Sequence, residues 1–143
     1  MRWVTKPSRI IDRLLRRQRL NEHRSTEVLP CSATDFDLLA TDLIAHGVTF
    51  RLRVWGGSMY PSICNGDLVL VEPVDVRSLR PGDVLFYRRR GGHLAHRLVE
   101  LREGGNVLIT RGDALDYLDP PVKPQDVLGR VVAVERSSRK ASP

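Results

Sequence analysis

The sequence predicts a mainly β protein: a compact, antiparallel and partly barrel-like β-domain preceded by short N-terminal helices. From residue 48 onward, short runs rich in Val, Leu, Ile and Phe follow one another at close intervals, as is typical of a small antiparallel β-domain. Turn signals such as Pro81-Gly82-Asp83, Gly91-Gly92 and Pro120-Pro121 separate these runs. The chain has 143 residues, of which 41% are hydrophobic, and this is enough to bury one core.

The same pattern gives the expected positions of the strands. They are residues 50–55, 67–72, 83–88, 93–101, 105–110 and 127–135.

A leading helix is expected at residues 34–46, before the first strand. Ser32 or Thr34 can cap its start, and Gly47 suits its exit. Its apolar stripe would consist of Phe36, Leu39, Leu43 and Ile44. We therefore divide the chain into a basic N-terminal arm with a linker, residues 1–30, and a β-domain with its leading helix, residues 31–143.

The excess of positive over negative charge lies entirely in the arm. The net charge is +6, yet residues 1–24 hold eight basic and two acidic residues, which leaves 15 of each sign for the remainder. Residues 8–20 have the pattern of a basic amphipathic helix. Such a helix can dock on its own domain, fray, or lie weakly on an anionic membrane surface. We expect docking or fraying, keep the membrane contact open, and do not expect a nucleic-acid partner.

The composition bears on the location of the protein and on the state of its cysteines. No apolar run is long enough to span a bilayer, and the N-terminus lacks the apolar centre of a signal peptide. We therefore expect a cytoplasmic protein or one peripheral at the membrane. Cys31 and Cys64 have no metal-type spacing, which favours free thiols, with one disulfide left open. No metal and no cofactor are expected.

Ser58 is the candidate nucleophile. It lies between two predicted strands in the segment Trp55 to Pro61, where Gly56 and Gly57 allow a sharp bend and the close approach of another backbone. A surface turn that happens to contain a serine is the other interpretation.

Histidine is the side chain most readily poised as a general base near neutral pH. His96 shares a strand face with Leu94 and Leu98, where a histidine is either a hydrogen-bonded core residue or a functional one. His93, next to a Gly-Gly turn, is expected to be solvated.

An acidic segment follows the fifth predicted strand. Asp113, Asp116 and Asp119 stand within seven residues, and they could orient a histidine or bind a cation. The alternating ligands and closing glutamate of a calcium loop are missing.

Five ordered blocks make the pattern more specific. They are Gly57-Ser58-Met59-Tyr60-Pro61 with Gly66-Asp67, Pro81-Gly82-Asp83-Val84, Ala95-His96-Arg97-Leu98, Thr110-Arg111-Gly112-Asp113 and Leu128-Gly129-Arg130-Val131-Val132. This series resembles the signal peptidase and LexA-type serine peptidase superfamily over roughly the last two-thirds of the chain. The base is a lysine in the bacterial members and a histidine in the archaeal and endoplasmic-reticulum signal peptidases. Because His96 occupies that position here, the histidine subtype is the closer match.

The resemblance implies a serine endopeptidase that processes leader peptides or pro-peptides by acyl transfer. Ser58 would be the nucleophile and His96 the base, while Asp119 or Asp113 would orient the imidazole. The Ser58 backbone N–H, in the segment Gly56-Gly57-Ser58, would stabilise the oxyanion. The partner would be an extended peptide or protein, added as a strand near residues 55–57.

One departure and two alternatives remain. Gly56 stands where many signal peptidases have a serine that helps to stabilise the oxyanion, so the second donor is open. A LexA-like self-cleaving regulator would need a scissile Ala-Gly or Cys-Gly, and neither dipeptide occurs. A non-catalytic module of the same fold that binds peptide strands is the other alternative.

Overall fold

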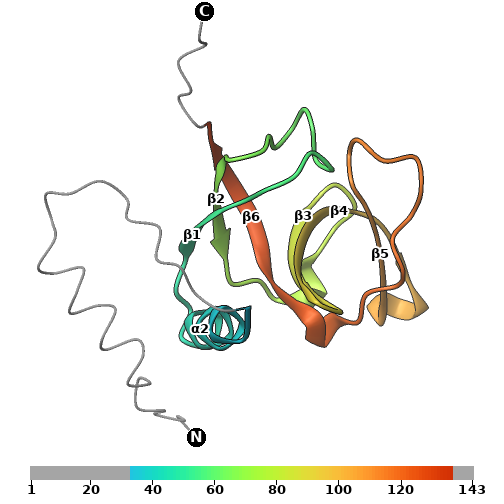
Figure 1. Ribbon diagram of the computed structural model, residues 1–143. Coiled ribbons are helices and arrows are strands. Elements are labelled where there is room, and N and C mark those ends of the chain that lie inside the picture. The colour runs from blue at the N-terminus through green and yellow to red at the C-terminus, as the bar shows by residue number, and fades with distance from the viewer. Residues whose placement is uncertain (1–32, 137–143) are drawn as a thin grey trace, which may run out of the picture. The chain divides into compact units, whose positions relative to one another are not determined.

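The computed structural model describes residues 33–136. The predicted arm, the helix expected at residues 8–20 and Cys31 lie outside these residues. The described elements are α2 (Ala33–Ala45), β1 (Phe50–Arg53), β2 (Leu68–Glu72), β3 (Val84–Arg89), β4 (Gly92–Arg102), β5 (Val107–Arg111) and β6 (Val127–Glu135). The prediction of a mainly β protein with a leading helix is confirmed, and Figure 1 shows the elements in place.

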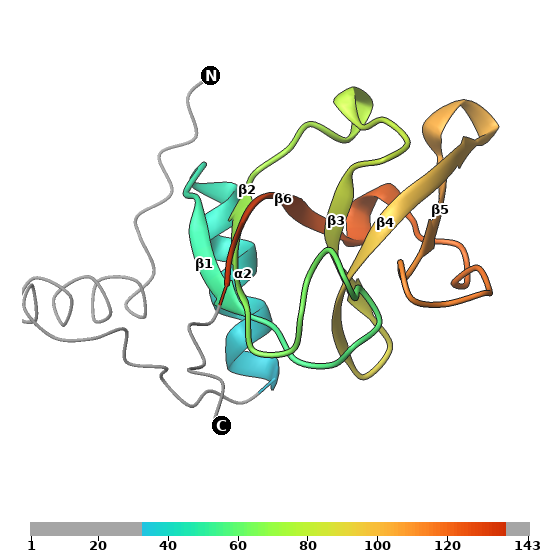
Figure 2. The same ribbon diagram turned by 90° about the horizontal axis from the view of Figure 1, so that it is seen from above.

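The strands form one six-stranded antiparallel sheet in the order β1-β2-β6-β3-β4-β5. The last strand, β6, lies between β2 and β3, so it joins the pair β1–β2 to the three strands β3, β4 and β5 (Figures 1 and 2). The register shifts three times, because β6 has an extra residue opposite β2 (Val132) and another opposite β3 (Leu128), and β4 has one opposite β5 (Val99). Such bulges bend strands and increase their twist. The sheet curves accordingly, and β1 and β5 are its edges.

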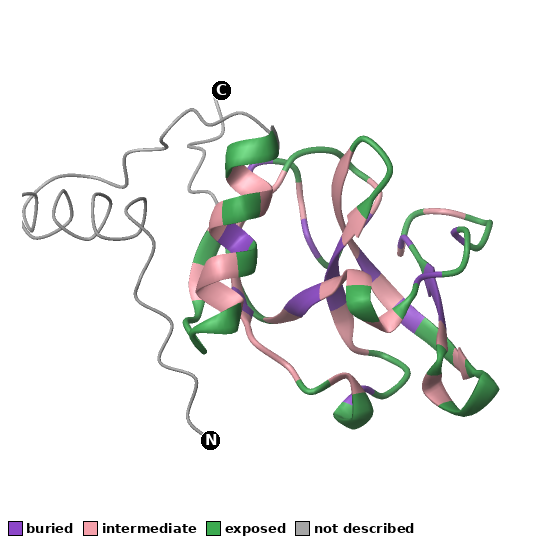
Figure 3. Ribbon diagram, turned by 90° about the horizontal axis from the view of Figure 1, so that it is seen from below, coloured by how far each residue is buried: buried purple, intermediate pink, exposed green. Residues whose placement is uncertain are grey.

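Helix α2 begins and ends one residue earlier than predicted. Thr34 therefore lies inside the helix, and Ser32 is outside the described residues. At the other end, Gly47 has a φ of 70°, and the N–H groups of Gly47 and Val48 donate to the carbonyls of Ile44 and Leu43. This pair of bonds is a Schellman motif, which uses the left-handed conformation that glycine adopts without steric cost. The four predicted stripe residues are half-buried, and exposed and half-buried stretches alternate along the helix (Figure 3).

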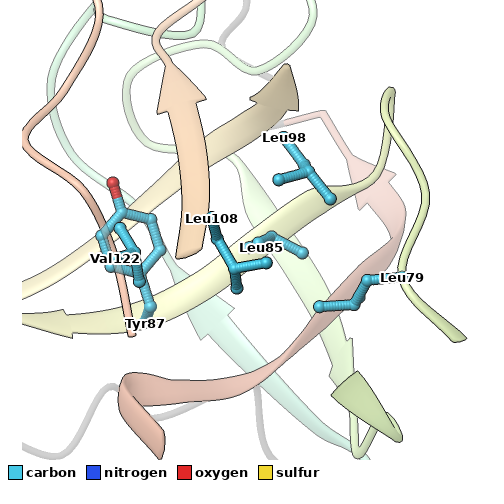
Figure 4. Packing of buried hydrophobic residues seen from close by; sticks show 6 residues of the cluster. All are labelled: Leu79, Leu85, Tyr87, Leu98, Leu108 and Val122. Carbon is cyan, nitrogen blue, oxygen red and sulfur yellow. The ribbon is translucent and has the colours of Figure 1, made fainter. Parts of the chain in front are cut away.

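One hydrophobic cluster lies on the β3–β4–β5 side of the sheet. Its buried members are Leu79, Leu85, Tyr87, Leu98, Leu108 and Val122 (Figure 4). Leu85 and Tyr87 are two residues apart on β3, so they point to the same face. This cluster holds β3, β4 and β5 together, and β4 and β5 carry residues of the site described below.

The prediction that His93 is solvated is wrong. Its ring is half-buried and stacks on Phe86, with centroids 5.6 Å apart and an interplanar angle of 21°. The register explains the contact, because His93 pairs with Arg88 and so lies diagonally across from Phe86. A strand neighbour two residues from the pairing partner is within reach of an aromatic ring.

Three further features bear on the type of protein. Cys64 is a free thiol. No helix within residues 33–136 is long and apolar enough to cross a membrane. The same residues contain no cluster of three or more His, Cys, Asp or Glu side chains that could hold a metal ion.

Candidate active site

Ser58 lies in a closed loop between β1 and β2. The loop is closed at its base, where Val54 N–H donates to Asp67 O and Gly66 N–H donates to Val54 O. Gly56 has a φ of 99°, a conformation that favours glycine. The loop between the two strands thereby holds Ser58, half-buried, at one end of the sheet.

Buried side chains hold this loop in one conformation. Met59 and Ile63 are 5% and 4% exposed, and the Ile63 N–H donates to Met59 O in a single helical turn. The buried carboxylate of Asp67 accepts the Cys64 N–H at 2.8 Å. The residues just after Ser58 are therefore anchored by packing and by hydrogen bonds, which limits the positions open to Ser58.

Three side chains from distant parts of the chain meet at Ser58. Ser58 Oγ lies 2.9 Å from His96 Nε2, and His96 Nδ1 lies 2.6 Å from Asp119 Oδ2. His96 is 2% exposed and Asp119 is 6% exposed. An ionised carboxylate only accepts hydrogen bonds, so it selects the tautomer with the proton on Nδ1. Nε2 is then left to accept the Ser58 hydroxyl proton.

Strand pairing explains how these residues meet. His96 is on β4, whose neighbour β5 ends at Arg111, just before the loop that carries Asp119. That loop returns to β5, because the Asp119 N–H donates to Thr110 O at 2.9 Å. The loop also contacts Ser58 directly, since the Ala114 N–H donates to Ser58 O at 2.9 Å.

The structure separates the two aspartates that the sequence left open. Asp119 contacts the imidazole, whereas Asp113 pairs with Arg97, with Nε and Nη2 each donating at 2.8 Å to a different carboxylate oxygen. Ser62 Oγ also donates to Asp113, at 2.6 Å. These hydrogen bonds, first of all those from Arg97, hold the pKa of Asp113 below its ordinary value. Asp113 thus joins β4 to the Ser58 loop, and Asp116 is exposed.

Gly112 allows the closest approach in the site. A Cβ atom added there would lie 2.6 Å from Ser58 O, 2.9 Å from Leu115 Cδ1 and 3.1 Å from His96 Nε2. The loop after β5 therefore packs against both Ser58 and His96 at Gly112, where only a residue without a side chain fits. Sequence reasoning named Gly112 only within a motif, and nothing in its spacing indicates this packing.

The glycines before Ser58 differ in their hydrogen bonding. The Gly56 N–H donates to Asn65 Oδ1 at 2.8 Å, so this donor is already engaged. The bonds found within residues 33–136 leave the N–H groups of both Gly57 and Ser58 without an acceptor. Of the segment Gly56-Gly57-Ser58, the N–H groups of Gly57 and Ser58 are therefore the ones not already engaged by the protein.

Two buried residues whose hydroxyls form a chain to Asp119 were not among the residues predicted from the sequence. Thr110 Oγ1 donates to Asp119 Oδ2 at 2.8 Å, and Tyr87 Oη lies 2.9 Å from Thr110 Oγ1. Thr110 is 0% exposed and Tyr87 is 1% exposed. Thr110 stands in one of the recognised blocks, but strand patterns alone do not distinguish a buried threonine that supports a site from one that fills the core.

Comparison with known families bears on the chain as a whole. The Peptidase S24-like family matches residues 22–132. The chain belongs to this family. The matched region includes the Ser58 loop, β4 and the loop that carries Asp119, and the membership indicates a serine peptidase. No curated protein matches the chain. The fold of this Peptidase S24-like chain, a six-stranded antiparallel sheet with a leading helix, is consistent with the family.

Proposed function

We propose that this Peptidase S24-like protein is a serine endopeptidase with Ser58 as nucleophile, His96 as general base and Asp119 as the group that orients the imidazole. One observation carries the proposal: the continuous pair of contacts from Ser58 Oγ to His96 Nε2 and from His96 Nδ1 to Asp119 Oδ2, at 2.9 and 2.6 Å. A nucleophile within hydrogen-bond reach of a base, which a third group orients in turn, is the arrangement that activates a serine.

The chemistry is acyl transfer. Ser58 Oγ attacks the peptide carbonyl carbon while its proton moves to His96 Nε2, and the oxyanion that forms is stabilised by the Ser58 N–H. The C–N bond then breaks, and the imidazolium gives its proton to the leaving amine. Water releases the acyl group from Ser58 by the same steps in reverse, with His96 again taking a proton. Asp119 stays ionised throughout and stabilises the imidazolium.

A histidine base favours the subtype found in archaeal and endoplasmic-reticulum signal peptidases. Of the three lysines in the chain, Lys6 and Lys140 lie outside the described residues. Lys123 precedes the short 3-10 helix Pro124–Asp126 and is not on β4. His96 is thus the basic group beside Ser58 on β4, the strand from which this superfamily takes its base.

The substrate class that we propose is an extended peptide, such as a leader or pro-peptide segment. Strand β1 is an edge of the sheet and runs directly into the segment before Ser58. An extended chain can add to such an edge through main-chain hydrogen bonds. The two exposed glycines at 56 and 57 leave room for that backbone.

A serine-directed fluorophosphonate probe tests the proposal, together with turnover of a library of quenched fluorescent peptides. We expect stoichiometric labelling at Ser58 and none in Ser58→Ala. Ser58→Ala and His96→Ala should each lower kcat/KM by on the order of a thousandfold or more. The double variant Ser58→Ala with His96→Ala should lose little more activity than either single variant, because the effects of residues that act as one catalytic unit are not additive. Ser78→Ala, in the exposed 3-10 helix Val76–Ser78, is the matched control and should react like the wild type.

Three results would contradict this proposal, and the first two would replace it with another function. A wild-type protein that binds peptides but neither labels nor cleaves would be a peptide-strand-binding module. Cleavage of the chain itself, at a rate independent of its concentration, would indicate a LexA-like self-cleaving regulator. His96→Ala with full activity would remove the histidine from the mechanism.

A further inference from the structure

A polar chain continues from Asp119 into the hydrophobic core. Tyr87 belongs to the buried cluster, and Figure 4 shows its ring among the aliphatic side chains with the hydroxyl oxygen at one end. That oxygen is 2.9 Å from Thr110 Oγ1, and Thr110 Oγ1 is 2.8 Å from Asp119 Oδ2. The hydroxyls of two buried residues thus form a hydrogen-bonded chain that leads to the carboxylate in contact with His96.

The hydrogens can be assigned along this chain. A carboxylate donates nothing, so the one hydroxyl proton of Thr110 points to Asp119. Thr110 Oγ1 is then free to accept, and Tyr87 donates to it. Burial raises the pKa of Tyr87 to about 12, so the phenol keeps its proton at neutral pH. The direct approach of Tyr87 Oη to Asp119 Oδ2, at 3.4 Å, is the longer of its two contacts.

Both Thr110 and His96 contact the same carboxylate oxygen, Oδ2. Two donors from different directions restrict the rotation of a carboxylate more than one donor does. The other oxygen, Oδ1, has the Arg89 guanidinium at 3.7 Å, on a side chain that is 43% exposed and therefore weakly held. Thr110 is accordingly the rigid support of Asp119, because it is fully buried on β5.

We propose that Thr110 is a positioning residue for the proposed peptidase: its hydroxyl holds Asp119 Oδ2 toward His96 Nδ1, and the Tyr87 hydroxyl orients that of Thr110. The inference rests on the proposed function, since it assigns a role to the support of that site. Neither hydroxyl touches the reacting atoms. They act by fixing the carboxylate, and through it the plane and tautomer of the imidazole.

Two substitutions at Thr110 separate positioning from packing. Thr110→Val removes the hydroxyl and keeps the branched volume, whereas Thr110→Ser keeps the hydroxyl and leaves a methyl-sized void. Loss of one hydrogen bond in the active state predicts a fall in kcat on the order of tenfold for Thr110→Val, with KM changed by less than about twofold. Thr110→Ser should retain kcat within about threefold. A packing role predicts the reverse order, because the void and not the missing hydroxyl would then do the damage.

Tyr87→Phe tests the outer link. It should lower kcat by roughly two- to fivefold. The double variant Tyr87→Phe with Thr110→Val should cost little beyond Thr110→Val alone, because the Tyr87 hydroxyl lies closer to Thr110 Oγ1, at 2.9 Å, than to Asp119 Oδ2, at 3.4 Å. Additive losses would contradict the relay. Urea unfolding of each variant establishes that the folded protein is being compared.

A spectroscopic readout keeps the inference separate from the proposed function. The proton between His96 Nδ1 and Asp119 Oδ2, two atoms that lie 2.6 Å apart, should give a low-field proton resonance that Asp119→Ala abolishes. Thr110→Val should shift or broaden this resonance and Thr110→Ser should leave it in place, whether or not any peptide is cleaved. If the resonance is the same in Thr110→Val and the wild type, the inference is overturned. If the wild type neither labels nor cleaves, the proposed function fails, and the resonance still decides whether Thr110 positions Asp119.

Discussion

Gly112→Ala is the substitution that the geometry of the site constrains most. The added Cβ would lie 2.6 Å from Ser58 O and 3.1 Å from His96 Nε2, whereas an ordinary contact begins at 3.4 Å. The Ser58 carbonyl would have to retreat by several tenths of an ångström, and it accepts the Ala114 N–H at 2.9 Å. Ser58 and His96 are therefore pushed apart by a change that removes no functional group.

The size of the effect follows from that displacement. Misplacing reacting groups by about 1 Å can cost on the order of 10²-fold in rate, so we expect kcat/KM to fall by roughly 10- to 100-fold. Overpacking of this kind also lowers the free energy of unfolding by about 1–3 kcal/mol. The measurements are peptide turnover, the rate of fluorophosphonate labelling at Ser58, and urea unfolding of the same preparations.

Gly129→Ala is the matched control. Its added Cβ would lie 2.6 Å from Glu72 O, the same clash with a backbone carbonyl, but between β6 and β2. We expect a comparable loss of stability with kcat/KM per folded molecule near the wild-type value. If Gly112→Ala keeps wild-type kcat/KM while losing as much stability as Gly129→Ala, the close packing of Gly112 against Ser58 and His96 has no catalytic consequence.

Three more predictions follow from the contacts of the site. Asp119→Asn should lower kcat on the order of 10³- to 10⁴-fold with the fold intact, because an amide cannot hold the same imidazole tautomer and charge; a loss below about tenfold would contradict the role of Asp119. Asp113→Asn should mainly lower stability, by about 1–2 kcal/mol at neutral pH. Since Arg97 holds the pKa of Asp113 below its ordinary value, this stabilisation is present above about pH 4 and is lost as the pH falls through the depressed pKa, so the urea midpoints of Asp113→Asn and wild type should converge in acid. His93→Ala, which removes the ring stacked on Phe86, should cost about 0.5–1.5 kcal/mol in urea unfolding and leave kcat within twofold, and a large loss of kcat would show that His93 contributes to the reaction.

Local chemistry made the elements predictable. Alternating apolar residues with Pro and Gly between them located all the strands to within about two residues, since period and turn chemistry are properties of short segments. Gly47 likewise marked the end of α2, because a left-handed residue is needed there whatever the helix packs against. His93 shows the limit of this approach: its exposure depends on Phe86, on the neighbouring strand, and no local pattern contains that register.

The sequence by itself determined the class of fold, the glycine-flanked serine and a short set of candidate partners for it. Only the tertiary structure decided which of them meet. Ser58 and His96 are 38 residues apart and come within 2.9 Å. The sequence favoured Asp119 over Asp113 without deciding between them, and the pairing of β4 with β5 directs Asp113 to Arg97 and Asp119 to His96. Tyr87 carried no signal, and the block that contains Thr110 and Gly112 did not indicate what either of them contacts. The physical reason is that hydrogen bonds and steric contacts act over a few ångströms in space, and the register of a sheet, not distance along the chain, sets which atoms come that close.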